Sequence, residues 1–196
     1  MFSKLSQKTV NVLYGTSVIS SEEKELYAYG FYMLFSYSFY FIFAALLGVI
    51  FHLLAESILF FLLFSLIRSY AGGVHASKEV SCMICTSLSF LASVAAIRLG
   101  ILFARPAAAF VVLAVASVSV LAFAPLDTPE KRLNDLERKH FRKISYLILF
   151  LIIALAILAF VIQKYRILYA CTASLGLEGT LLFIGHLDST MACQDS

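Results

Sequence analysis

The stretch 144–162, "ISYLILFLIIALAILAFVI", carries no charged side chain and decides the fold class. A hydrocarbon core about 30 Å thick is crossed by roughly 20 helical residues. Within lipid, only helices and closed barrels satisfy every backbone polar group. This stretch lacks the alternation of barrel strands, so it predicts a transmembrane helix.

Five further apolar segments qualify or nearly qualify as membrane spans: 27–50, 53–70, 82–103, 106–124 and 167–186. The whole chain is 61% hydrophobic and 14% charged, whereas soluble domains carry about 25% charged residues. The sequence therefore predicts an all-α, polytopic membrane bundle of about six transmembrane helices, and it excludes an ordinary soluble domain.

The 196 residues are expected to form a single integral-membrane domain. Residues 1–26 mix apolar and basic positions and predict an amphipathic N-terminal helix at the membrane surface. They have no continuous apolar core of the kind found in a cleaved signal peptide. Residues 27–186 form the predicted bundle, and 187–196 a tail. The net charge of +3 is modest, and no nucleic-acid partner is expected.

The basic residues are unevenly divided between the two sides of the predicted bundle. Six crossings place eleven on the side of both termini and only three on the other. The eleven are Lys4, Lys8, Lys24, Arg68, Lys78, Lys131, Arg132, Arg138, Lys139, Arg142 and Lys143. The positive-inside rule then predicts a cytoplasmic location for the termini and for the loops 71–81 and 125–143. This orientation depends on 53–70 crossing the membrane rather than re-entering it.

The candidate chemistry lies in "RSYAGGVHASKEVSCMIC", residues 68–85. A thiolate at Cys82 would be favoured by the start of a helix there, and His75 is a candidate base. Seven residues of straight helix rise about 10.5 Å, too far for a hydrogen bond of about 3 Å. The two side chains can pair only if the chain bends between them, and Gly72 and Gly73 permit this.

Two other interpretations of this stretch stay open at this point. The histidine and the cysteine can be incidental residues of a turn between buried helices. A metal site would draw on His75, Cys82 and Cys85, but no second ligand pair completes a zinc centre. No metal or cofactor is therefore expected, and Cys85 is interpreted as a small apolar helix residue.

Arg68, Ala71, Gly72, Gly73, His75, Ala76 and Cys82, set between apolar helices, resemble the signature of the AgrB (accessory gene regulator B) family. A second similarity is "APLDTPEKR", residues 124–132, which resembles the family's Ala-Pro-x-Asp loop followed by a basic stretch. The resemblance covers nearly the whole chain. It implies a membrane-embedded cysteine endopeptidase of bacterial quorum sensing.

The resemblance implies that Cys82 attacks an AgrD-like precursor peptide with His75 as general base, forming an acyl-enzyme thioester. A cysteine or serine of the bound precursor then closes a macrocycle, the autoinducing peptide. The other implied partners are the lipid bilayer and a second copy of the chain in a homodimer.

Four further residues are candidates for binding the substrate or stabilising the oxyanion: Arg68, Gly72, Gly73 and Asp127. Arg68 is equally well explained as an anchor at the lipid headgroups, and Asp127 as a cap or turn residue. Glu56 and Arg98 lie at membrane depth, where ionisable residues are partnered or functional, but the sequence indicates no pair for either.

Two alternative functions also stay open. One is a transporter that exports the cyclic peptide, with Glu56 and Arg98 in its pathway. The other is a membrane interaction protein without catalytic activity, in which the glycine-rich loop is only a turn.

Overall fold

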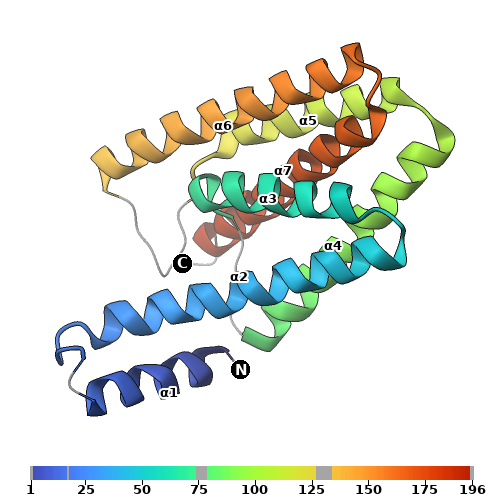
Figure 1. Ribbon diagram of the computed structural model, residues 1–196. Coiled ribbons are helices and arrows are strands. Elements are labelled where there is room, and N and C mark those ends of the chain that lie inside the picture. The colour runs from blue at the N-terminus through green and yellow to red at the C-terminus, as the bar shows by residue number, and fades with distance from the viewer. Residues whose placement is uncertain (1, 17, 74–78, 127–133, 195–196) are drawn as a thin grey trace.

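The computed structural model describes residues 2–16, 18–73, 79–126 and 134–194, with side chains described as far as Leu187. This part of the chain forms seven helices and no strand (Figure 1). They are α1 (Phe2–Gly15), α2 (Lys24–Ile50), α3 (Leu54–Ala71), α4 (Glu79–Phe103), α5 (Pro106–Phe123), α6 (Asp135–Val161) and α7 (Tyr165–Gln194). Helices α2 to α7 are each long and apolar enough to cross a membrane. The predicted all-α bundle with six spans is thereby confirmed.

Helix α6 starts well before the predicted residue 144 because a capping box begins it at Asn134. The Asn134 side chain accepts a hydrogen bond from the helix backbone, and the Asn134 N–H donates to Glu137 Oε2 at 3.0 Å. Two otherwise unpaired donors are satisfied in this way. The basic residues of 138–143, predicted to lie in a loop, therefore occupy the first turns of a helix and are exposed there.

Helix α7 lies at the centre of the bundle, in contact with α3, α4, α5 and α6. Its closest neighbour is α5: a Cβ atom at Gly179 would lie 2.9 Å from the Ala116 Cα, and one at Gly176 would lie 3.2 Å from Val112. Small residues at such positions let two helix backbones approach closely. Since both residue numbers rise together, α5 and α7 run parallel.

Among the side chains that the structure describes, two ion pairs join α3 to α7, one near each end of α3. Glu56 Oε1 lies 2.9 Å from Arg166 Nε, and Arg68 Nη1 lies 3.8 Å from Glu178 Oε2. In each helix the two positions are twelve residues apart, which corresponds to about 18 Å. Helices α3 and α7 therefore run side by side in the same direction. This is the arrangement expected when six helices cross in turn, because α3, α5 and α7 are the second, fourth and sixth spans.

The bundle thus has two ends, which we name the Gly72 end and the Glu56 end after residues at the two ends of α3. Gly72 and Leu126 form a β-bridge at the Gly72 end. At the Glu56 end, Arg166 Nη2 is 3.5 Å from the His52 carbonyl oxygen. Gly72 and Leu126, which belong to two of the loops that the charge count placed on one side of the membrane, are therefore neighbours in space.

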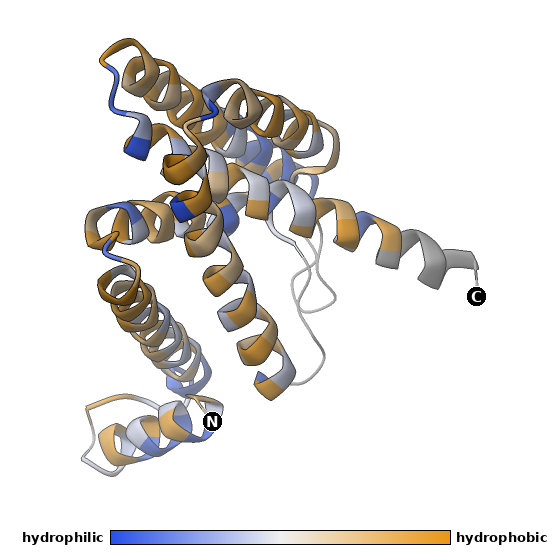
Figure 2. Ribbon diagram, turned by 90° about the vertical axis from the view of Figure 1, so that its right-hand side faces the viewer, coloured by the Kyte–Doolittle hydropathy of each residue, from blue (hydrophilic) through white to orange (hydrophobic). Residues whose placement is uncertain are grey.

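The long helices of the bundle are mostly apolar, as their orange colour in Figure 2 shows. Large side chains such as Leu46, Val115 and Leu151 are more than half exposed, which suits contact with lipid. Helix α1 packs instead along α2. It buries Phe2, Ser6 and Val10, which share one face at a spacing of four residues. Helix α7 continues to Gln194, into the segment predicted as a tail.

Candidate active site

Cys82 lies in the first turns of α4, three residues after Glu79. The Phe90 ring of the same helix packs against Phe60 and Phe64 of α3, at centroid distances of 5.3 and 5.5 Å. Cys82 lies two helical turns before Phe90, toward the start of α4. It is partly exposed, and the unpaired N–H groups of a helix start favour an anion at this position.

Glu79 attaches the start of α4 to the N-terminal helix. Its carboxylate accepts hydrogen bonds from the Phe2 N–H at 2.6 Å, the Ser3 N–H at 3.2 Å and the Ser3 hydroxyl at 2.9 Å. The acid therefore satisfies donors at the start of α1, which have no partner within their own helix. This contact places α1 beside the helix that carries Cys82.

Helix α2 also packs against α4. The Tyr40 ring of α2 lies 5.7 Å from the Phe90 ring of α4, measured between ring centroids.

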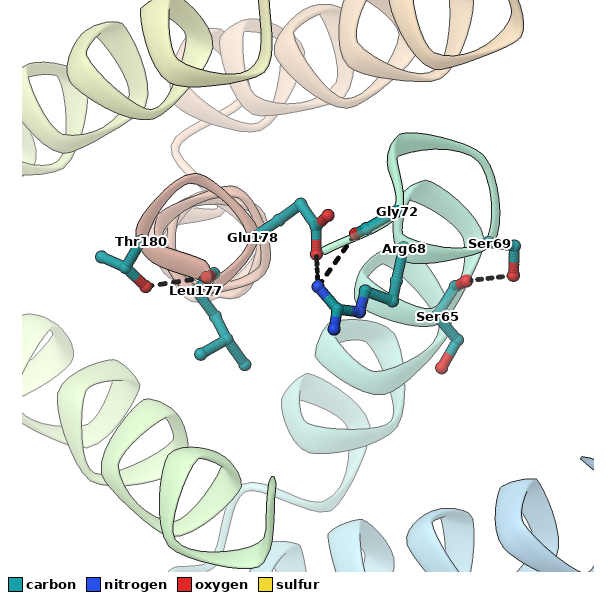
Figure 3. Close-up of polar contacts among 7 residues, drawn as sticks. All are labelled: Ser65, Arg68, Ser69, Gly72, Leu177, Glu178 and Thr180. Atoms are coloured by element: carbon teal, nitrogen blue, oxygen red, sulfur yellow. Dashed lines mark hydrogen bonds and ion pairs between the residues drawn. The ribbon is translucent and has the colours of Figure 1, made fainter. Parts of the chain in front are cut away.

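The Arg68 side chain points toward Glu178 of α7 (Figure 3). Its Nη1 donates to the Gly72 carbonyl oxygen at 2.9 Å and lies 3.8 Å from the Glu178 carboxylate, and its side chain is 17% exposed. Glu178 is fully buried. The sequence analysis missed Glu178, although an acidic residue within an otherwise apolar span is a signal for a functional or partnered group.

Gly72 ends α3 with φ 77° and ψ −154°, and Gly73 has φ 138°. These values suit glycine, which has no Cβ to clash. The Gly72 N–H donates to the Arg68 carbonyl oxygen at 3.2 Å, and the Leu126 N–H donates to the Ala71 carbonyl oxygen at 2.9 Å. The two segments that carry the resemblance motifs are therefore brought together, 54 positions apart along the chain.

His75 and Asp127 lie outside the described residues, so the predicted contact of His75 with Cys82 and the role of Asp127 stay predictions. The two glycines and Arg68, by contrast, form one connected group with Glu178. Cys85, one turn after Cys82, is exposed, and Cys171 is buried in the core. Within the described ranges, no group of three or more His, Cys, Asp or Glu side chains is placed to hold a metal ion.

The ionisable residues at membrane depth have separate surroundings. Glu56, for which the sequence indicated no partner, pairs with Arg166 and lines a cavity of about 390 Å³ at the Glu56 end. Arg98 is exposed on the outside of α4. A larger cavity of about 600 Å³ lies between α4, α5 and α7 and is lined mainly by small and hydroxyl side chains. Neither of these cavities is lined by both Glu56 and Arg98, so neither connects the two residues into a pathway.

Comparison with known proteins gives one family. The sequence matches AgrB, accessory gene regulator B, over residues 6–182. It is 27% identical to AgrB-like protein 2 of Clostridium perfringens strain 13 over 154 residues, which covers 72% of this chain and 69% of the relative. It is 26% identical to an AgrB-like protein of strain SM101, with the same coverage. No solved structure gives a significant match.

The family match includes the stretch 68–85 and the whole of α2 to α6. The six apolar helices and the match together describe a multi-pass membrane protein. The chain belongs to the AgrB family, and this membership supports a role in processing an autoinducer peptide for quorum sensing.

Proposed function

We propose that this protein is a membrane-embedded cysteine endopeptidase that cleaves an AgrD-like precursor peptide and promotes its macrocyclisation to an autoinducing peptide. The observation that carries the proposal is the position of Cys82, partly exposed in the first turns of α4, the helix that follows the glycine-rich exit from α3 in the chain. A buried cysteine such as Cys171 offers no such access to a peptide.

In the proposed reaction, the Cys82 Sγ attacks a peptide carbonyl of the precursor and His75 accepts the thiol proton. A thioester forms, the peptide C–N bond breaks, and His75 gives the proton to the leaving amine of the released tail. A thiol or hydroxyl of the bound precursor then attacks the thioester and closes the ring. The Cys82 sulfur leaves and regains a proton.

Ring closure competes with hydrolysis of the thioester. A nucleophile held within the same bound peptide has a large effective concentration, and an apolar bundle around the site limits access of water. The apolar helices on which α4 packs fit this requirement.

The exit from α3 supplies the groups proposed to assist this chemistry. Gly73 and Arg68 are proposed to stabilise the oxyanion or bind the precursor, together with Gly72 and Asp127. Because the Gly72 N–H already donates to the Arg68 carbonyl oxygen, Gly73 is the better placed of the two glycines to donate a backbone N–H.

We further propose that the Gly72 end faces the cytoplasm, where a newly made peptide would meet Cys82. The exposed basic side chains at the start of α6 lie at this end, and they would attract anionic lipid headgroups. A homodimer in the bilayer belongs to the same proposal.

The test is tail release in liposomes that contain the purified protein and the precursor, followed by mass spectrometry. Cys82→Ala and His75→Ala are expected to abolish both the released tail and the ring. Cys85→Ala, a matched substitution one helical turn away, is expected to retain both. Cleavage that survives in Cys82→Ala would refute the peptidase. Cleavage retained in Cys82→Ser with loss of transport would instead support an exporter.

A further inference from the structure

Glu178 is a carboxylate buried at membrane depth near a single described cation. Its side chain is fully buried, and neither of its oxygens receives a hydrogen bond from the residues the structure describes. Arg68 Nη1, at 3.8 Å, is the charge that faces it. Removing a carboxylate from water costs several kcal/mol, and a distant partner repays this only in part. A pair with this geometry is therefore poorly explained by stability alone.

The Arg68 side chain reaches the backbone that leaves α3. Its Nη1 donates to the Gly72 carbonyl oxygen at 2.9 Å (Figure 3). Its guanidinium also occupies the space that a side chain at Gly73 would need, because a Cβ there would meet Nη1 and Cζ well inside 3.0 Å. Arg68 therefore contacts both glycines, and the Nη1 atom that bonds to Gly72 also faces the Glu178 carboxylate (Figure 3).

We propose that Glu178 is a positioning residue for the peptidase reaction. Through Arg68, its carboxylate fixes the backbone at Gly72 and Gly73, where the chain enters the segment that carries His75. This inference rests on the proposed function, because it assigns Glu178 the task of presenting the base to Cys82. Without the carboxylate, Arg68 loses one of the groups that hold its guanidinium beside Gly72 and Gly73, and the exit from α3 is less constrained.

The chain contains a matched control for this inference. Glu56 and Arg166 form the other ion pair between α3 and α7, with Glu56 only 8% exposed. Glu56→Gln makes the same chemical change in the same two helices, at the end remote from Cys82. If Glu178 only joins α3 to α7, the two variants should have the same consequences.

The experiment uses the full chain in liposomes and two readouts. The first is kcat and KM for tail release from the AgrD-like precursor. The second is the pH dependence of Cys82 alkylation by iodoacetamide, resolved from that of Cys85 by peptide mapping. Glu178→Gln is expected to lower kcat roughly 10–100-fold, since a misplacement of about 1 Å has effects of this size, with KM nearly unchanged. The alkylation midpoint of Cys82 should move up toward that of a free thiol, about 8.5.

Glu56→Gln should leave kcat and the Cys82 profile at wild-type values, even if its unfolding temperature falls. The Cys85 profile should be the same in all proteins. Because Glu178→Gln leaves the Arg68 charge without the carboxylate that faces it, the double variant Arg68→Gln/Glu178→Gln, which removes both charges, is the second test. It should fold and still show the slow kcat and the shifted Cys82 profile.

Wild-type kcat and an unchanged Cys82 profile in Glu178→Gln, or in the double variant, would overturn the inference. Equal effects of Glu56→Gln and Glu178→Gln would overturn it as well. Absence of tail release by the wild-type protein would refute the proposed function instead, and the alkylation profiles would still show whether Glu178 controls Cys82.

Discussion

Replacement of Gly72 by alanine tests whether the exit from α3 is as constrained as its geometry indicates. Gly72 has φ 77° and ψ −154°, a region that essentially only glycine adopts and that costs other residues about 1–3 kcal/mol. The new Cβ would also lie well inside 3.0 Å of the Leu126 carbonyl oxygen. That oxygen belongs to the backbone, so the clash is relieved only if the bridged segment moves.

Movement of this segment breaks the hydrogen bond from the Leu126 N–H to the Ala71 carbonyl oxygen, which is worth about 1 kcal/mol. The total expected loss in the free energy of unfolding is about 2–4 kcal/mol. For a chain of this length, that corresponds to a decrease of roughly 5–15 °C in unfolding temperature. Tail release from the precursor should fall as well, because Arg68 also bonds to Gly72.

The assay is thermal unfolding in detergent, followed by circular dichroism at the helix band. Gly30→Ala is the matched control, because a Cβ at this position in α2 meets no atom within 4 Å. Alanine is favoured over glycine in a helix by about 1 kcal/mol, so the control should be as stable as wild type or slightly more so. If Gly72→Ala unfolded at the wild-type temperature, the argument from φ, ψ and the close approach of Leu126 would be wrong.

Two further predictions concern the ends of helices. Glu79→Gln weakens the acceptor that the Phe2 and Ser3 N–H groups share. The first amides of α1 should then exchange hydrogen faster, as measured by mass spectrometry. Unchanged exchange would show that α1 is held by its apolar face alone. Asn134→Ala removes the capping box with Glu137 and should cost about 1 kcal/mol, seen as faster exchange confined to the first turns of α6. The exposed Asn11→Ala in α1 should leave α6 unchanged, and equal exchange in both variants would contradict the assignment of the cap.

The elements of the fold could be predicted closely because their cause is local. A run of apolar residues long enough to cross the hydrocarbon core forms a helix wherever it lies. Four predicted spans match α2, α3, α4 and α5 at both ends within a few residues, a fifth matches the start of α7, and the sixth matches the end of α6. Helix α6 differs because its first turns are charged. The length of an apolar run does not reveal such turns, although the sequence contains the residues of the capping box, Asn134 and Glu137.

The sequence by itself determined the fold class, the family and the candidate nucleophile, since each depends on composition or on residues close together in the chain. Only the tertiary structure decided which charges meet. Glu178 and Arg68 are 110 positions apart, and Glu79 is 77 positions from Phe2, whose N–H donates to it. Such pairs depend on which helices become neighbours and on their axial register. The axial register of two helices is set where their backbones come close, as Gly179 does to Ala116. Many weak packing contacts act together at such places, and the spacing of residues in the sequence does not reveal them.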